Sequence, residues 1–242
     1  MIMIDLPGAE TYELQFKYMP WGQVIDRVAS KVAELVKPDG TVVDLMSGTG
    51  LLLKKISLLR PDLTMVGIDI DPGYIEYANL HNRNENVSYC LRDVSEWQAE
   101  RAYDCVLCTA GLHHLENVRH SDFLRKMSRA AVEGGVCICA EPCLGDVGLA
   151  PKSAKLLEAA KLGYEYLKVV IRNDAPLSVI QATIDIISND MLGVQSGSSE
   201  CKDSIAQLKH MAQVYFGDVE VEKVWPKNGR EGYGDYILTM RE

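Results

Sequence analysis

The stretch from residue 42 to residue 59 restricts the fold more than any other part of the chain. It begins with the apolar run Val42, Val43 and Leu45, passes through a turn that contains Gly48 and Gly50, and ends in a segment with helical apolar spacing. A short buried strand that leads through a glycine turn into a helix is typical of a layered α/β protein. The stretch therefore predicts a sheet with helices packed on it.

The same alternation continues to about residue 142. The runs LTMVGI, VSYCL, YDCVLCT and VCICA predict strands, while GYIEYANLHNR and FLRKMSRAAV predict helices. Gly134 and Gly135 are expected to form the break between the last helix and the last strand. Strands that alternate with helices of ten or more residues favour a parallel sheet covered on both faces.

The last part of the chain follows a different pattern. DVEVEKVWP and GYGDYILTM are joined by the turn-rich PKNGRE without a helical segment, which predicts an antiparallel hairpin at the end of the sheet. Residues 143–217 predict a helical insertion, with helices near 151–170, 176–192 and 201–216 and a polar break at QSGSSE. We expect this insertion to form a lid over the carboxyl edge of the sheet.

Composition and charge narrow the class of protein. A chain of 242 residues suits one domain, and no run approaches the roughly 20 apolar residues of a membrane-spanning helix. The net charge of -9 opposes binding to nucleic acid, whose affinity for proteins depends on clustered Lys and Arg. The first residues contain no basic region followed by an apolar run, so we expect a cytoplasmic protein without a membrane partner.

The seven cysteines raise the question of a metal site. Several lie in predicted strands, where buried reduced thiols are common. Cys105 and Cys108 are three residues apart, so on a strand they point to opposite faces of the sheet. We therefore expect no bound metal.

The glycine turn lies where an open parallel sheet binds its ligands, beyond the carboxyl ends of its strands. Asp44, Gly48 and Gly50 lie at this end, and the two glycines would let a ligand approach the backbone closely, although an ordinary strand-to-helix turn also uses glycine. The dinucleotide fingerprint fails, because its third glycine is replaced by Leu53, and the turn has no GK[ST] for a phosphate loop. Asp69 ends the next strand, as a ribose ligand or as a turn or helix cap.

Five stretches, in this order, are similar to the class I methyltransferase family: VVDLMSGTG, VGIDIDPGYIEYA, LRD at 91–93, YDCVLCTAGLHHLEN and FLRKMSRAAVEGGVCICAEP. The resemblance covers about half of the chain. It implies a Rossmann-like, doubly wound and mostly parallel seven-stranded sheet, with S-adenosyl-L-methionine as the cofactor. The single domain then comprises an N-terminal arm (1–22), a cofactor-binding core (23–142), the helical lid (143–217) and the closing hairpin (218–242).

The same resemblance implies which positions contact each part of the cofactor. They are Asp44, Met46, Ser47, Gly48 and Gly50 for the methionine part, Asp69 for the ribose, Ile70, Asp93 and Val94 for the adenine, and Thr109 and Ala110 for the methyl side. Met46 and Ser47 replace the small residues that usually precede the second glycine. Met46 therefore places a larger side chain beside the cofactor.

Methyl transfer is an in-line displacement at a sulfonium, so the protein must align a nucleophile, exclude water and remove a proton where needed. His113, His114 and Glu141 follow the fourth and fifth strands, and one of the histidines is our expected base. The alternative is a histidine pair that only packs and forms hydrogen bonds in the loop.

The acceptor is expected to be a small molecule. The fourth strand ends in TAGL at 109–112 instead of the N/D-P-P-Y/F typical of nucleic-acid base methylases. We therefore predict a methyltransferase acting on a hydroxyl, amine or activated carbon of a small molecule, as in secondary metabolism. Two alternatives stay open: a cyclase or isomerase that uses the sulfonium without methyl transfer, and a non-catalytic binding protein. The lid helices also leave room for a homodimer.

Overall fold

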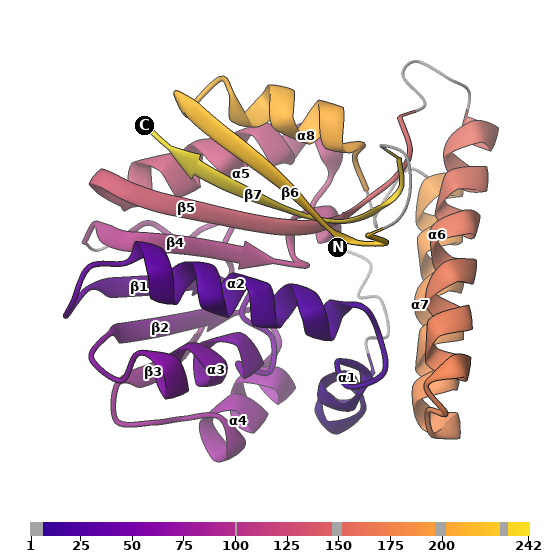
Figure 1. Cartoon of the computed structure of the whole chain (residues 1–242), viewed down its shortest axis with the longest axis horizontal. Coiled ribbons are helices and arrows are strands. Elements are labelled where there is room, and N and C mark those ends of the chain that lie inside the picture. Colours follow the sequence, from indigo (N-terminus) through magenta and orange to yellow (C-terminus); the bar gives the residue numbers. More distant parts are fainter. Residues whose placement is uncertain (1–6, 100, 147–151, 197–201, 228–231) are drawn as a thin grey trace.

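Seven strands form one mixed sheet in the order β3-β2-β1-β4-β5-β7-β6 (Figure 1). The computed structural model describes residues 7–99, 101–146, 152–196, 202–227 and 232–242. The parallel strands are β1 (Thr41–Leu45), β2 (Thr64–Asp69), β3 (Val87–Leu91), β4 (Tyr103–Thr109) and β5 (Ala131–Cys143). β7 (Gly234–Arg241) runs antiparallel to both β5 and β6 (Asp218–Trp225). The predicted Rossmann-like sheet with its closing hairpin is confirmed.

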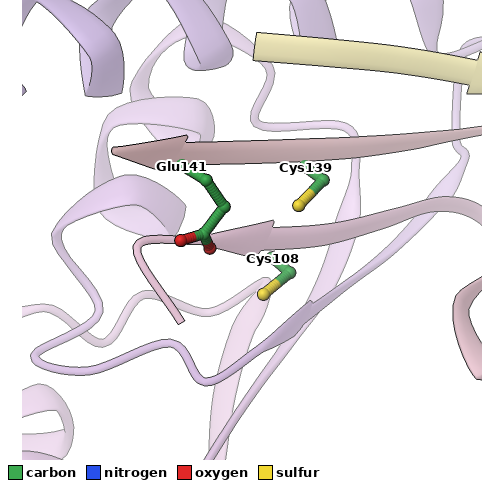
Figure 2. Close-up of side chains that lie close together, drawn as sticks. All are labelled: Cys108, Cys139 and Glu141. Carbon is green, nitrogen blue, oxygen red and sulfur yellow. The ribbon is translucent and has the colours of Figure 1, made fainter. Parts of the chain in front are cut away.

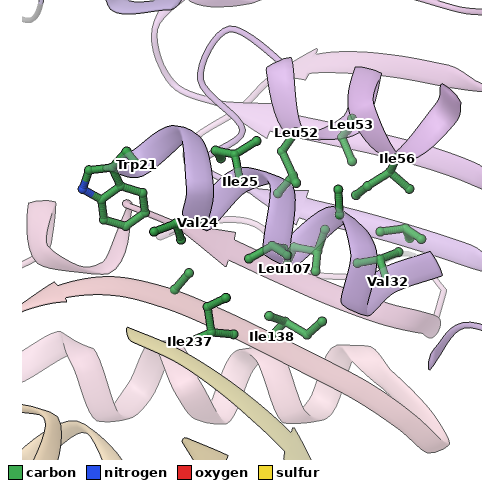
Figure 3. Close-up of a cluster of buried hydrophobic side chains, with 14 of the residues drawn as sticks. Trp21, Val24, Ile25, Val32, Leu52, Leu53, Ile56, Leu107, Ile138 and Ile237 are labelled. Atoms are coloured by element: carbon green, nitrogen blue, oxygen red, sulfur yellow. The ribbon is translucent and has the colours of Figure 1, made fainter. Parts of the chain in front are cut away.

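Helices cover both faces of this sheet. One face carries α2 (Trp21–Leu35), α3 (Leu51–Leu59) and α4 (Pro72–His81), and the other carries α5 (Asn117–Ala130) and α8 (Ile205–Ala212). Val24, Val28 and Val32 recur every four residues, so one side of α2 faces the strands. They pack with Leu107 and Ile138 of the sheet (Figure 3). Each fully buried aliphatic side chain contributes about 1.5–3 kcal/mol relative to an exposed one.

The start of β5 differs from the prediction. α5 ends at Ala130 and the strand begins at Ala131, so Gly134 and Gly135 lie inside β5 and do not separate it from the helix. The β4–β5 register shifts between the pairs Tyr103–Ala131 and Cys105–Val136, and Gly134 has a φ of 73°. The two glycines therefore belong to a bulge within the strand, a role that glycine also commonly fills.

The helices after β5 separate into two groups. α6 (Lys152–Arg172) and α7 (Leu177–Ser196) pair with each other at one side of the molecule, beyond the ends of the strands, where Tyr166 of α6 contacts β6 and β7 (Figure 1). α8, the third helix of the predicted insertion, packs instead against α5 and the β6–β7 hairpin. α1 (Ala9–Gln15) contacts both α4 and α7, so the N-terminal arm bridges the core and the helix pair. The polar break at QSGSSE falls largely outside the described residues.

The length and composition of the described helices bear on the membrane prediction. None of them is both long enough and apolar enough to span a bilayer.

Candidate functional site

The strand order reverses between β1 and β4, because the chain builds outward from β1 to β3 on one side and from β4 to the hairpin on the other. Side chains at the carboxyl ends of two such strands flank a crevice. Asp44 near the end of β1 and Thr109 at the end of β4 lie beside it.

The glycine turn after β1 has the left-handed backbone that its sequence suggested. Gly48 and Gly50 have φ values of 54° and 79°. A Cβ on Gly48 would stand 3.5 Å from the Tyr12 ring of the arm, whereas a Cβ on Gly50 would approach the Tyr89 hydroxyl to 2.4 Å. Of these two glycines, Gly48 borders the crevice. Gly50 cannot carry a side chain, because the side chain would collide with the tyrosine packed beneath the loop.

Three buried polar atoms at this crevice have no hydrogen-bond partner among the described residues: Asp44 Oδ1, Ser47 Oγ and Thr109 Oγ1. Burial, followed by the nearby Asp69, raises the pKa of Asp44 to about 8. A buried polar group without a partner costs about 1–3 kcal/mol. Because all three residues line one small cavity, a ligand bearing a cation and hydrogen-bonding groups would satisfy them.

Asp69, expected at the ribose, is tied to the glycine loop. Its Oδ2 accepts a hydrogen bond from the Gly48 amide at 2.7 Å, and its Oδ1 accepts one from the Asp71 amide at 2.9 Å. Burial raises its pKa, and these amides oppose the shift. Asp71, and not Asp69, caps α4 by accepting from the Tyr74 amide. Asp69 therefore links the end of β2 to the glycine loop that follows β1.

The three residues expected at the adenine lie just past β2 and β3. Ile70 is exposed, Val94 is buried and Asp93 is half-buried, with Asp93 Oδ1 accepting from the Ser95 amide at 2.7 Å. An exposed apolar side chain beside a partly exposed carboxylate is an arrangement that can receive a flat polar ring. No cavity among those described joins the three.

His113 and Glu141 form a buried dyad at the ends of β4 and β5. His113 Nδ1 lies 2.6 Å from Glu141 Oε2, while Glu141 Oε1 accepts from the amides of Gly111 and Leu112 at 2.9 and 2.8 Å. Burial would raise the pKa of Glu141, but His113 and the two amides hold it below its ordinary value. Burial lowers the pKa of His113, with His114 adding to this effect and Glu141 opposing it. A neutral His113 beside a carboxylate is poised to accept a proton.

His114 is placed differently from His113. Its side chain is exposed, and its ring centroid lies 4.2 Å from that of His113. The structure therefore separates the two histidines: His113 is hydrogen-bonded to Glu141 in the buried dyad, whereas His114 lines a cavity beside it from a more exposed position.

A second cavity, of about 100 Å³, adjoins the dyad. It is mostly apolar, and its walls come from the arm, the helix pair and the ends of β4 and β5. It shares Tyr12, Phe16 and Ala110 with the cavity at the glycine loop, which is only about 30 Å³. The two cavities therefore meet at Ala110, whose φ of 53° is unusual for a residue with a Cβ.

The spacing of Cys105 and Cys108 predicted that they point to opposite faces of the sheet. Cys105 and Cys108 pack into different cores on opposite faces of the sheet. Cys108 instead lies beside Cys139 of the next strand, with Glu141 close to both (Figure 2). The three ligand atoms lie within 4.8 Å of one another, but both Glu141 oxygens already hold other groups. Burial raises the pKa of both thiols.

Comparison with known proteins identifies this arrangement. Residues 42–135, which run from β1 through the glycine loop to the start of β5, match the model of a methyltransferase domain. The malonyl-[acyl-carrier protein] O-methyltransferase of Acetivibrio thermocellus is 30% identical over 38% of this chain and 34% of its own. The trans-aconitate 2-methyltransferase of Methylobacterium radiotolerans is also 30% identical, over 39% and 35%. Residues 42–135 are therefore a methyltransferase domain of the class I S-adenosylmethionine-dependent type.

Solved structures share the fold of this chain over nearly its whole length. The DhpI-SAM-HEP complex has a TM-score of 0.59 and 18% identity, covering 97% of this chain and 94% of the other. An O-methyltransferase family protein from Burkholderia thailandensis has a TM-score of 0.58 and 15% identity, covering 90% and 55%. These likenesses concern the fold. The matched stretch spans only about a third of the length of the two curated relatives named above.

Several residues around these cavities had no signal in the sequence. Lys202 and Asp190 form a buried ion pair in the wall of the larger cavity, and the Tyr166 hydroxyl donates to the buried Asp235. These pairs join segments far apart in the chain, and neither belongs to a motif. Gln15 also lines this cavity, and its side-chain Nε2 is buried without a partner among the described residues.

Proposed function

We propose that this chain transfers a methyl group from S-adenosyl-L-methionine to a small molecule held in the cavity between α1, α6 and α7. The observation that carries the proposal is that this cavity and the one at the glycine loop share Ala110, directly beside the His113–Glu141 dyad. Two adjoining cavities with a base beside them suit a reaction between two bound molecules.

The residues at the crevice fit the cofactor. Asp44, with a pKa of about 8 and an unpartnered oxygen, would hold the ammonium of its methionine part, and Ser47 and Thr109 supply further polar atoms. Asp69 would hold the ribose, and Asp93 with Ile70 and Val94 the adenine. The loop cavity is smaller than the cofactor, so Tyr12 and Phe16 must move outward to admit it.

The dyad would prepare the acceptor. The cofactor supplies a methyl group on a cationic sulfur that a nucleophile displaces in line. Glu141 fixes the proton of His113 on Nδ1, which leaves Nε2 to take the proton of an acceptor hydroxyl or amine. The apolar walls of the cavity exclude water and orient the acceptor.

The cavity walls favour a small acceptor with an apolar body and a polar group. Aromatic and aliphatic side chains from the arm face Gln15 and the Asp190–Lys202 pair. One relative is named for malonyl-[acyl-carrier protein] and the other for trans-aconitate, and the second name agrees with a small free acceptor. The net charge of -9 argues against nucleic acid as the acceptor.

A second candidate is an enzyme that uses the same cofactor without methylating an acceptor. The carboxy-S-adenosyl-L-methionine synthase of Desulfotalea psychrophila is 26% identical over 49% of this chain and 51% of its own. In that case the larger cavity would hold a second reactant that supplies the carboxy group of the modified cofactor. Release of S-adenosylhomocysteine distinguishes the two, because only methyl transfer produces it.

Calorimetry in two buffers of different ionisation enthalpy tests the cofactor site. If an ammonium binds beside Asp44, the pKa of this carboxyl falls from about 8, so at pH 7 the protein releases close to one proton on binding. Asp44→Asn should release none and bind at least about tenfold more weakly, the loss expected for a charge-assisted contact. Equal proton release by both proteins would contradict this role of Asp44.

Methyl transfer itself is tested with methyl-labelled cofactor and a panel of small alcohols, phenols, amines and acids. We expect a labelled product and S-adenosylhomocysteine in equal amounts. Tight cofactor binding with no labelled product across the panel, together with a modified cofactor, would favour the second candidate.

A further inference from the structure

The outer side of α6 carries apolar side chains that are largely exposed in the described part of the chain, although the Lys168 ammonium lies over the Tyr164 ring at 5.3 Å. Leu157, Tyr164 and Ile171 follow one another at seven-residue intervals and are 57%, 61% and 57% exposed. Ala160 and Leu167 lie between them and are half-buried. Apolar residues that alternate at spacings of three and four form the seam by which one helix packs along another.

α6 does not need this seam for packing within its own chain. Its opposite side buries Leu162, Tyr166 and Val170 against the rest of the molecule. α6 and α7 stand at the edge of the structure (Figure 1). The seam is therefore a second apolar face on a helix that already has one.

We propose that this seam joins two copies of the chain through antiparallel packing of α6 on α6 of the second copy. The two-fold axis then passes the middle of the helix, level with residue 162, so that the whole length of α6 contributes to the interface. The layers are then Ser153 with Ile171, Leu157 with Leu167, and Ala160 with Tyr164. A small side chain meets a large one in two layers, and leucine meets leucine in the third.

Parallel packing would fit less well. Tyr164 would then face Tyr164 of the other copy, and Ala160 would face Ala160. Such a seam alternates between crowded layers and poorly filled layers, and both reduce the stability of the interface. The order of side-chain sizes along α6 therefore favours the antiparallel arrangement.

The charges beside the seam favour a protein partner over a lipid surface. Lys161 and Lys168 flank it, but each is paired on its own helix, with Glu158 at 2.6 Å and Glu165 at 2.8 Å. These pairs reduce repulsion between lysines of two copies. They also occupy the lysines that would contact anionic headgroups, and the chain's charge of -9 opposes such a surface.

The interface has a consequence for the site, although it does not depend on the proposed function. Tyr166, two residues from Tyr164, lines the larger cavity and stacks with Trp225 at a centroid distance of 5.2 Å. A partner held against the outer side of α6 would restrict the movement of this wall.

Sedimentation over a range of concentrations tests the interface. We expect the wild-type protein to dimerise, and the double variant Leu157→Gln/Ile171→Gln to raise the dimer dissociation constant about tenfold or more. The matched control is Leu58→Gln/Leu80→Gln, which removes two leucines that are 73% and 74% exposed outside the seam. A wild-type monomer at every concentration, or a dimer unaffected by the seam change in a folded protein, would overturn the proposal.

Cross-linking tests the direction, in a background where the exposed Cys90 is replaced by Ser. In the antiparallel dimer, Lys161→Cys should cross-link to itself, whereas Leu157→Cys should cross-link only when mixed with Leu167→Cys. Self-cross-linking of Leu157→Cys would exclude the antiparallel arrangement. Monomeric wild-type protein that binds phosphatidylserine vesicles through the seam would replace the second copy with a lipid surface.

Discussion

Glu141 uses its two carboxylate oxygens for different tasks. Oε1 accepts the amides of Gly111 and Leu112, which fixes the loop after β4, while Oε2 holds His113 Nδ1. A carboxylate with three donors is stabilised in its charged form, although it is buried. The loop that carries His113 and the group that orients its ring are thus fixed by a single side chain.

This division makes Glu141→Gln informative. The two amides would keep the remaining carbonyl oxygen, so the new NH₂ group would point at His113 Nδ1 and force the ring proton onto Nε2. A base with its proton on the reacting nitrogen is inactive. We expect kcat to fall about 10²–10⁴-fold, the usual contribution of a general base, with cofactor affinity nearly unchanged.

Glu133→Gln is the matched control, because it makes the same substitution on β5 at an exposed position at the start of the strand, away from the dyad. Its kcat should stay within a few-fold of the wild-type value. Since the pKa of His113 is lowered from its ordinary value of 6.5, the midpoint of the decline of the wild-type kcat at acidic pH should lie below 6.5. An unchanged kcat in Glu141→Gln would show that the acceptor needs no base.

The residues of the dyad could be predicted because strand ends can be located from the sequence. Apolar runs buried on both faces mark β4 and β5, and polar residues just beyond parallel strands meet at one edge. The sequence did not reveal which histidine pairs with Glu141, because His113 and His114 are adjacent and only the turn of the loop separates them. Tyr89 beneath Gly50 was also missed, since its position depends on packing between elements.

At the scale of elements, the strands were easier to predict than their boundaries or the position of the helices after β5. The glycine pair inside β5 resembles a helix end, and only the pairing with β4 shows it to be a bulge. α8 has the apolar spacing expected of any packed helix, and the spacing does not say which surface it covers. Contacts between elements far apart in the sequence thus determine the strand boundaries and helix positions that local patterns do not specify.

α1 is the element whose docking matters most for the site. Tyr12 stacks on Tyr74 of α4 at a centroid distance of 5.1 Å and contacts Phe16 edge-on at 5.2 Å. Glu13 accepts a hydrogen bond from the Asn82 side chain at 2.7 Å. These contacts hold the arm over the glycine loop, where it closes both cavities.

Tyr12→Ala should therefore separate cofactor entry from acceptor binding. Loss of the aromatic contacts, each about 0.5–1.5 kcal/mol, should speed cofactor association roughly 2- to 10-fold and raise the acceptor KM, because the larger cavity loses part of its wall. Stopped-flow binding and steady-state kinetics measure the two effects. Leu58→Ala, an exposed change on α3, should alter neither. Slower cofactor association in Tyr12→Ala would mean that the arm guides the cofactor in.

Across the whole molecule, two buried aspartates give stability an unusual pH dependence. Asp44 lies in the loop cavity, and Asp235 lies on β7 under Tyr166. Burial raises the pKa of each to about 8. The folded protein therefore keeps protons that the unfolded chain, with carboxyl pKa values near 3.8, has already released.

The sign of the effect follows from this difference in proton binding. Stability should fall as the pH rises from about 4 to 8 and level off above that, because the unfolded chain binds fewer protons over this window. Carboxyls with lowered pKa values, such as Glu141 and Glu222, act in the opposite sense and remove stability as the pH falls towards 4 and below. Without cofactor, the melting temperature should therefore be highest at mildly acidic pH.

Asp235→Asn tests this without touching the proposed cofactor site. An amide can still accept from the Tyr166 hydroxyl but does not ionise, so the decrease in melting temperature between pH 5 and pH 8 should become several degrees smaller than in the wild type, at about 2–4 °C for each kcal/mol. The exposed change Asp122→Asn should leave the wild-type slope in place. If Asp235→Asn kept the same slope, the buried carboxyl would already be ionised in the folded protein, and its charge would have to be balanced by Lys202 and Lys223, whose fields oppose the shift.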